Sequence, residues 1–222
     1  MRKIMEPSFY FIYLAAIICF GIILMAKSKT RKYLLTFGLA CVILGVGDAF
    51  HLIPRAIGLF TDTLDNPSAT LNIYLGIGKL ITSVTMTVFY ILLYMTIYIK
   101  RKRARSTFLD IVMVILFVSR IALLALPQNE WAINGGDMII GIVRNIPFVI
   151  MGGIMIFLTF KYLCEKPYRI MWILILLSFI FYLPVVIWAG SAAWVGLLMI
   201  PKTVCYLLIG ILGLIDCHKK NK

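Results

Sequence analysis

The side chains best suited to chemistry in this sequence are charged residues that interrupt long apolar stretches. Asp48, His51 and Arg55 are spaced i, i+3 and i+7, so on a helix they share one face. An aspartate and a histidine placed in this way could work as a general acid and base. The same spacing also fits a core histidine that is hydrogen-bonded to the aspartate. Both interpretations remain open from the sequence.

Polar residues interrupt four other apolar stretches in a similar way. At a rise of 1.5 Å per residue, they come out roughly 9 to 14 Å from the same end of their helices as Asp48 and His51. A charge near the middle of a membrane helix costs about 2.5 to 3.5 kcal/mol, so several charges at one depth indicate a function. We therefore predict a ligand-binding layer made of Asp48, His51, Lys79, Arg120, Arg144, Asn145, Lys202 and Tyr206.

The predicted layer carries more positive than negative charge. Asp48 is the carboxylate expected at this depth, whereas four or five cations share it. An unpaired cation away from water is unfavourable. The excess therefore indicates an anionic ligand, a water-filled vestibule, or long side chains that reach towards lipid headgroups. Arg55 and Arg120 could equally face lipid in this way, and the other cations are expected to face a cavity.

Metal and disulfide chemistry are not indicated by the sequence. The two histidines, His51 and His218, lie far apart along the chain. The five cysteines fall in apolar runs or near helix ends, and their spacing matches neither a metal-ligand pair nor a disulfide framework. We therefore predict no metal and no cofactor.

The elements that must position this layer are membrane helices. The chain contains 62% hydrophobic and 14% charged residues, whereas a soluble domain is usually about half apolar. A membrane-spanning helix requires roughly 20 apolar residues. We predict an all-α integral membrane protein, a bundle of seven transmembrane helices in a single domain over residues 1–222. The predicted helices are 8–26, 33–57, 71–99, 107–126, 138–160, 169–190 and 193–215.

Charged connectors predict the orientation of the bundle. Fifteen of the 22 Lys and Arg residues lie in connectors 27–32, 100–105 and 161–169 and in the C-terminal tail. The alternate connectors, TDTLDNPSAT and PQNEWAINGGD, are acidic and contain no Lys or Arg. By the positive-inside rule, the N-terminus is outside and the C-terminus cytoplasmic, in a multi-pass protein of the cell membrane. Topology thus accounts for most of the +13 charge, so membrane lipid is the expected partner and nucleic acid is not.

Two further expectations concern four prolines and a possible internal repeat of the chain. Pro54, Pro147, Pro184 and Pro201 fall near the depth of the layer, where each is expected to bend its helix and free a carbonyl. AFHLIPRAIG is similar to IFYLPVVIWAG, and lysine has a matching depth in GIGKLITSV and LMIPKTVCY. We therefore predict two parallel helix triplets around the fourth helix, as in some transporters. The cytoplasmic half of the bundle is expected to be almost purely apolar.

Short stretches resemble three membrane-protein families. YLPVVIWAGS followed by a lysine in the last helix is similar to microbial rhodopsins, which implies retinal on Lys202, but Lys79 stands where that family has a carboxylate. GVGDAFH is similar to alkaline ceramidases, which are zinc-dependent lipid amidases, but Lys202 and Tyr206 replace their His-x-x-x-His pair. Pro127-Gln128 resembles the PQ-loop sugar transporters but lies outside the helical context of that motif. No family is assigned on these short stretches.

Together these features predict a transporter or receptor-like protein. The excess positive charge indicates that a small anionic solute or lipid headgroup enters the basic layer from the outer side. An intramembrane lipid-modifying enzyme that uses Asp48 and His51 is one alternative. A membrane scaffold or partner subunit, in which the layer forms only internal salt bridges, is the other. No obvious nucleophile or metal set supports an enzyme, so we lean against one. The cytoplasmic connectors are too short for a catalytic domain, so any signalling would have to pass through a separate partner.

Overall fold

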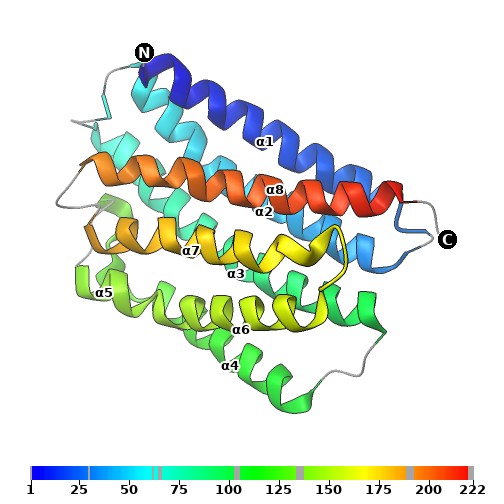
Figure 1. The fold of residues 1–222 in the computed structure, drawn as a ribbon. Coiled ribbons are helices and arrows are strands. Elements are labelled where there is room, and N and C mark those ends of the chain that lie inside the picture. The colour runs from blue at the N-terminus through cyan, green and yellow to red at the C-terminus, as the bar shows by residue number, and fades with distance from the viewer. Residues whose placement is uncertain are drawn as a thin grey trace.

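The computed structural model describes residues 2–29, 31–61, 63–64, 67–102, 106–133, 138–188 and 193–219, which form helices joined by short connections (Figure 1). The α-helices are α1 (Arg2–Ala26), α2 (Tyr33–Phe60), α3 (Ala69–Arg101), α4 (Thr107–Leu124), α5 (Met138–Val143), α6 (Ile146–Tyr162), α7 (Met171–Trp188) and α8 (Met199–His218). Short 3-10 helices occur at η1 (Pro127–Asn129), η2 (Trp131–Ile133), η3 (Tyr168–Ile170) and η4 (Ala193–Leu198).

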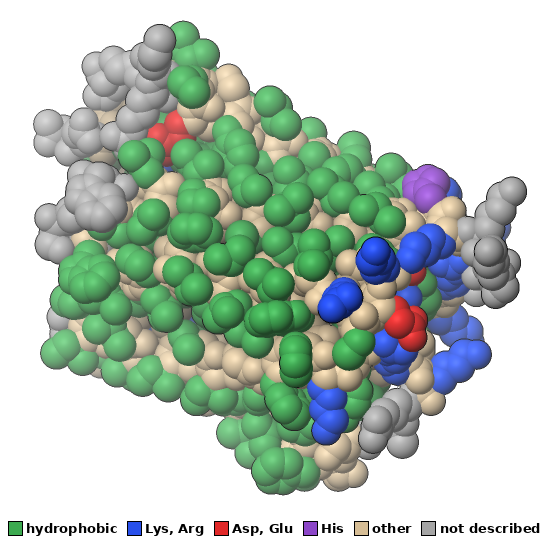
Figure 2. Space-filling view, in the orientation of Figure 1, with side chains coloured by type: hydrophobic (Ala, Val, Ile, Leu, Met, Phe, Trp, Pro, Cys, Tyr) green, Lys and Arg blue, Asp and Glu red, His purple; other side chains and the backbone are tan. Residues whose placement is uncertain are grey.

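Seven helical segments of the described chain are long and apolar enough to cross a membrane. Helices α5 and α6 together make one of these segments, Met138–Tyr162, and each of the other long helices makes one. Apolar side chains cover most of the bundle flank seen in Figure 2, while basic side chains gather at the end where α8 stops. The predicted all-helical membrane bundle of seven spans is therefore confirmed, and the protein is a polytopic membrane protein.

Three helix boundaries differ from the prediction in ways that matter for function. Helix α1 begins at Arg2 instead of residue 8, which brings Glu6 into the bundle. The predicted helix 138–160 is broken at Arg144 and Asn145, between α5 and α6. Pro147 lies at the start of α6, where its missing N–H would have no helical partner in any case.

Only two of the four prolines that were expected to bend a helix lie inside one. Pro54 and Pro184 lie inside α2 and α7, where a proline removes a backbone hydrogen bond. Pro147 and Pro201 instead lie in the first turns of α6 and α8. The expectation that all four interrupt a helix was wrong for these two, because the N–H groups of the first turn of a helix have no acceptor within that helix.

Glycines allow α1, α2 and α3 to pack closely. A Cβ on Gly38 would lie 2.6 Å from the carbonyl oxygen of Gly21, and a Cβ on Gly78 would lie 2.3 Å from the carbonyl oxygen of Phe50. Backbone atoms cannot move aside as a flexible side chain can, so these crossings require glycine. Helix α2 makes its most extensive contacts with these two neighbours. The side chains of α2 are thereby held in a fixed rotation beside α3.

The other helices complete the bundle around an aromatic core. Helix α8 packs against α1 and α7, α7 packs against α6, and α6 packs against α3 and α4. Rings from three of these helices meet at Tyr90, Phe148 and Phe179, with Tyr90 and Phe148 edge to face at 5.2 Å between ring centroids. These rings are part of the buried core of the bundle.

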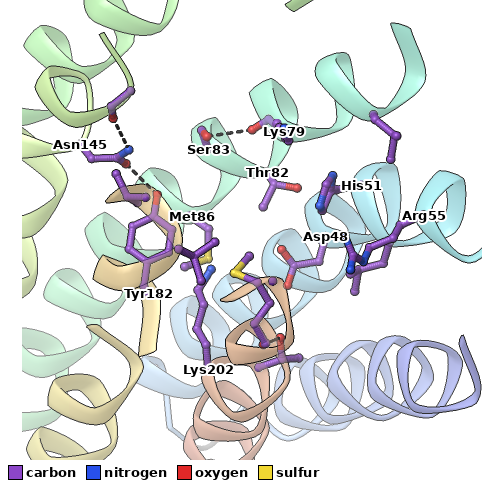
Figure 3. A pocket seen from close by; sticks show the side chains of 18 of the residues that line it. Asp48, His51, Arg55, Lys79, Thr82, Ser83, Met86, Asn145, Tyr182 and Lys202 are labelled. Atoms are coloured by element: carbon purple, nitrogen blue, oxygen red, sulfur yellow. Dashed lines mark hydrogen bonds between the residues drawn. The ribbon is translucent and has the colours of Figure 1, made fainter. Parts of the chain in front are cut away.

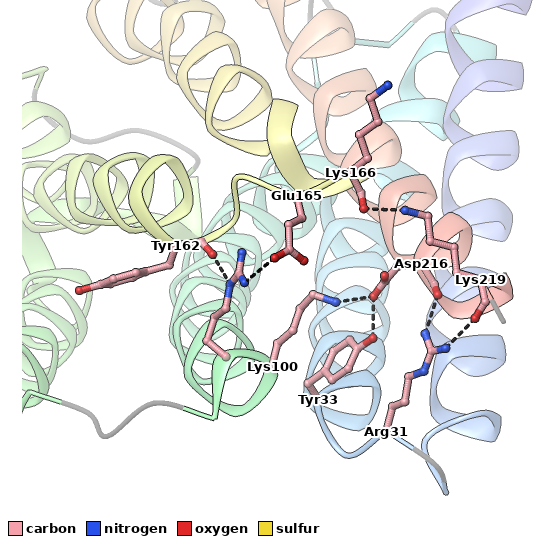
Figure 4. A network of polar contacts seen from close by, with 9 residues as sticks. Arg31, Tyr33, Lys100, Tyr162, Glu165, Lys166, Asp216 and Lys219 are labelled. Atoms are coloured by element: carbon pink, nitrogen blue, oxygen red, sulfur yellow. Dashed lines mark hydrogen bonds and ion pairs between the residues drawn. The ribbon is translucent and has the colours of Figure 1, made fainter. Parts of the chain in front are cut away.

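A polar network crosses the end of the bundle where α1 and α8 stop, which we call the basic end (Figure 4). Lys100 on α3 forms an ion pair of 2.7 Å with Asp216 on α8, and the Tyr33 hydroxyl donates to the same carboxylate oxygen at 2.6 Å. The Asp216 residue is only 7% exposed. Lys100 and Asp216 lie just beyond the predicted helices 71–99 and 193–215, so this network joins the ends of α2, α3 and α8.

Neither the orientation nor the helix duplication is supported by the fold. The two proposed triplets also differ in detail, since α1 is continuous whereas α5 and α6 are separated by a break. Both remain predictions.

Candidate functional site

A cavity of about 500 Å³ lies between the helices at the end opposite the basic end, which we call the cavity end. It is lined by all eight residues that were predicted from the sequence to form a ligand-binding layer. These residues come from α2, α3, α4, α8 and the α5–α6 break, and several are shown in Figure 3. The structure thus places the predicted residues around one cavity. Its other polar lining residues include Tyr10, Arg55, Thr82, Ser83, Tyr182 and Thr203.

Arg120 on α4 is the most deeply buried charge of the cavity, at 1% exposed. Its Nε donates to the Thr87 hydroxyl at 2.9 Å, and its Nη1 donates to the Asn145 side-chain oxygen at 3.1 Å and the Arg144 carbonyl at 3.0 Å. The guanidinium also lies 4.2 Å from the centre of the Phe148 ring. The interpretation that Arg120 faces lipid was wrong, because the side chain turns inward to acceptors on α3 and the helix break.

The break between α5 and α6 positions Arg144 and Asn145. The Asn145 side-chain oxygen accepts from Arg120 and also from the Tyr182 hydroxyl at 2.7 Å, so it joins α4 to α7. Arg144 donates to the Asn129 side-chain oxygen at 2.7 Å and lies 4.5 Å from the Trp131 ring centre. All these acceptors are neutral. The two arginines are therefore fixed in place without loss of their positive charge.

The two lysines of the site differ in exposure, and neither has an acidic contact among the described residues. Lys202 is 6% exposed, and its ammonium lies 4.6 Å from the centre of the Tyr182 ring. Figure 3 shows it reaching between Tyr182 and Asp48. Lys79 is exposed at the cavity. Among the residues that the structure describes, no carboxylate lies within 4 Å of either ammonium.

Hydroxyl groups lie one turn beyond each lysine, as their spacing predicts, but they are engaged within the protein. The Ser83 hydroxyl donates to the Lys79 carbonyl at 2.7 Å. The Tyr206 hydroxyl lies 3.1 Å from the Tyr90 hydroxyl and accepts from Ser178 at 3.4 Å. Tyr206 is thereby fixed as part of the cavity floor.

Asp48 and His51 line the same cavity, but no hydrogen bond joins them. The Tyr13 hydroxyl of α1 donates to Asp48 Oδ2 at 2.7 Å. The His51 Nδ1 atom is buried and has no hydrogen-bond partner among the described residues. The interpretation of His51 as a core histidine hydrogen-bonded to Asp48 was therefore wrong, because α1 supplies the partner of the carboxylate instead.

The charge of Arg55 is balanced by Glu6, which was not predicted to be a site residue. Its Nη2 lies 2.9 Å from Glu6 Oε1, its Nε donates to the same oxygen at 3.0 Å, and it also donates to the Tyr10 hydroxyl at 2.9 Å. The alternative that Arg55 faces lipid was thus wrong. The spacing of Glu6 and Tyr10, i and i+4, was a signal that α1 starts earlier, since these two residues share one helix face.

Other positioning residues could not have been found from hydropathy. Tyr13, Thr87 and Tyr182 are ordinary residues of apolar helices, and Asn129 lies in the η1 turn. No sequence pattern marked any of them as a site residue, because the role of each depends on a hydrogen-bond partner at least 15 residues away.

Within the described residues, no group of three or more His, Cys, Asp or Glu side chains is arranged to hold a metal ion. We therefore assign no metal ligand at the cavity. Comparisons of the chain with protein-family models, with curated proteins and with solved structures found no match.

Proposed function

We propose that this protein binds a small anionic solute or lipid headgroup in the cavity, as a transporter or a receptor-like protein. The observation that carries this proposal is the charge of the cavity lining, which contains five basic side chains and one carboxylate among the described residues. Arg55 is paired with Glu6. Lys79, Arg120 and Arg144 have no carboxylate within 4 Å in the described part of the chain.

The way in which Arg120 is held supports a binding role. Three hydrogen bonds to neutral acceptors fix its guanidinium at the cavity before any ligand arrives. A buried cation normally requires a counter-charge because removal from water is unfavourable. A preorganised cation next to an open cavity therefore favours an anion as the missing counter-charge.

We further propose that the cavity end faces the outside of the cell and the basic end faces the cytoplasm. The support for this orientation is the gathering of Lys and Arg at the basic end, which is typical of cytoplasmic connectors. In this orientation, the cavity would receive its anion from the outer side of the cell membrane.

The two alternatives receive less support. An enzyme with an Asp48 and His51 pair would be expected to join these side chains, but Asp48 accepts from Tyr13. A scaffold with only internal salt bridges would pair the cations of the layer, but three of them lack a described carboxylate partner. We therefore prefer a binding function.

Binding of anions to purified protein in nanodiscs of zwitterionic lipid tests the proposal. We expect Lys79→Met, Arg144→Met and Lys202→Met each to weaken anion affinity by about tenfold, equivalent to about 1.4 kcal/mol. The matched control is Lys161→Met, which removes an exposed lysine at the other end of α6 and should leave affinity unchanged. Unfolding temperatures must show that the variants are folded. Unchanged affinity in all three folded variants would exclude the proposed site.

A further inference from the structure

The positive charge of the cavity is not evenly distributed. On the side formed by α1, α2 and α8, Arg55 is paired with Glu6, and Lys202 faces the same space as Asp48. Among the described side chains, the two cations on this side are therefore matched by two carboxylates.

The excess of positive charge among the described lining residues lies on the side formed by α3, α4 and the α5–α6 break. Lys79, Arg120 and Arg144 stand there without a described carboxylate partner. All three line the same cavity, and the Arg120 guanidinium donates to the carbonyl of Arg144, which places these two residues side by side. The three cations also form a gradient of exposure, with Lys79 exposed, Arg144 partly buried and Arg120 buried.

Three neighbouring cations favour a ligand group that carries more than one negative charge. One carboxylate carries a single negative charge and would leave most of the excess unbalanced. A phosphate monoester carries about 1.5 to 2 negative charges at neutral pH and offers three oxygen acceptors. The guanidinium fork fits phosphate oxygens in pairs, and an ammonium adds a point charge. Two arginines and a lysine therefore suit a phosphoryl group better than a single carboxylate.

The cavity is larger than a phosphoryl group requires. Its volume of about 500 Å³ falls within the range of about 300 to 1,000 Å³ that is typical of sites for organic ligands. The rest of the lining combines polar and apolar side chains, and part of the apolar share lies nearer to the helix ends than the cations do. Its apolar residues include Leu64, Pro67, Leu75, Met86, Phe148, Val185, Val186 and Met199.

We infer that the cavity takes a phosphate monoester attached to an apolar body, with the phosphoryl group held by Lys79, Arg120 and Arg144. This inference rests on the proposed anion-binding function and names the ligand class for the same cavity. The apolar body lies against Val185 and Val186 in the last turn of α7 and against Leu64 and Pro67 in the α2–α3 connection.

Binding of matched ligands to the full chain in nanodiscs of zwitterionic lipid tests the inference. Octyl phosphate and octanoate share one chain and differ in the acidic group, and inorganic phosphate has the group without the chain. We expect octyl phosphate to bind about tenfold tighter than either. In Lys79→Met and Arg144→Met, the ratio between octyl phosphate and octanoate should fall towards one. In the control Lys161→Met, this ratio should stay at the wild-type value.

A second arm distinguishes the source of the ester. Phosphatidic acid in the nanodisc should compete with octyl phosphate if the ester is a membrane lipid, and tight octyl phosphate binding without such competition supports a soluble ester. Equal affinities for octyl phosphate and octanoate, both lost in the variants, would overturn the phosphoryl preference and leave the anion site intact. Failure of the folded wild-type protein to bind any of the three anions would overturn the anion site itself.

Discussion

At the scale of single residues, the cavity shows how a buried charge can be retained for binding. Arg120 is held by a threonine hydroxyl, an asparagine oxygen and a backbone carbonyl, none of which cancels its charge. Asp48 has the opposite sign and is bonded to the Tyr13 hydroxyl. As the one carboxylate among the described lining residues, Asp48 should oppose the binding of an anion.

Replacement of Asp48 by asparagine tests this opposition. Asp48→Asn keeps an oxygen that can accept from Tyr13 but removes the negative charge. We expect anion affinity to rise by about fivefold, or about 1 kcal/mol, because a like charge no longer repels the ligand. Titration of the purified variant with the same anions measures the change. Asp110→Asn is a suitable control, since Asp110 accepts from Tyr94 and does not line the cavity. Weaker binding in Asp48→Asn would contradict a repulsive role for this carboxylate.

At the scale of helices, close glycine crossings fix the direction in which each side chain points. Gly78 lies against the backbone of α2 at Phe50 and His51. Lys79, the next residue, lines the cavity. Loss of this close approach would therefore disturb both the stability of the bundle and the placement of the site.

Gly78→Ala should destabilise the protein by about 2 kcal/mol or more, because its Cβ would lie 2.3 Å from the Phe50 carbonyl oxygen and the two helices would have to separate. Unfolding in detergent, followed by circular dichroism, measures this loss. Gly153→Ala on α6 is the matched control, since a Cβ there meets nothing within 4 Å. The control should be neutral or stabilising by up to about 1 kcal/mol through helix propensity. Equal stability of the two variants would show that the crossing tolerates a side chain.

At the scale of the whole molecule, the bundle has two polar ends with different arrangements of charge. Among the described residues, three cations on one side of the cavity, Lys79, Arg120 and Arg144, have no carboxylate within 4 Å, whereas the basic end contains the ion pairs of Lys100 with Asp216 and Arg101 with Glu165. The basic-end network joins the start of α2 and the end of α3 to the end of α8. We therefore expect it to contribute to stability and not to anion binding.

Asp216→Asn should lower the free energy of unfolding by about 1 to 3 kcal/mol, because Lys100 and Tyr33 would lose a buried charged partner. Glu165→Gln breaks a comparable pair with Arg101, but the Glu165 side chain is 77% exposed. This control should cost less than about 1 kcal/mol. Thermal unfolding of both variants gives the comparison, and an equal effect of the two substitutions would argue against a buried network.

The proposed orientation has its own test. In a background with the native cysteines replaced, a Gln128→Cys label site should react with a membrane-impermeant maleimide on intact cells, because Gln128 is exposed at the cavity end. Cys164, exposed at the basic end and retained alone in the same background, should react only after the cells are permeabilised. The reverse pattern would place the cavity on the cytoplasmic side.

The sequence by itself determined the helical spans and the common depth of the polar layer. Apolar length and the rise per residue are local properties, so residues as far apart as Asp48 and Lys202 could be assigned to one level without knowledge of their contacts. All eight predicted site residues accordingly line one cavity.

Only the tertiary structure decided which way the side chains face and what they contact. The rotation of a helix about its axis depends on packing against its neighbours, which hydropathy does not encode. This rotation turns Arg120 inward and pairs Arg55 with Glu6. It also makes the Tyr13 hydroxyl, and not His51, the hydrogen-bond partner of Asp48. The level of each residue along the bundle was therefore readable from the chain, whereas the charge balance of the cavity depended on contacts between distant helices.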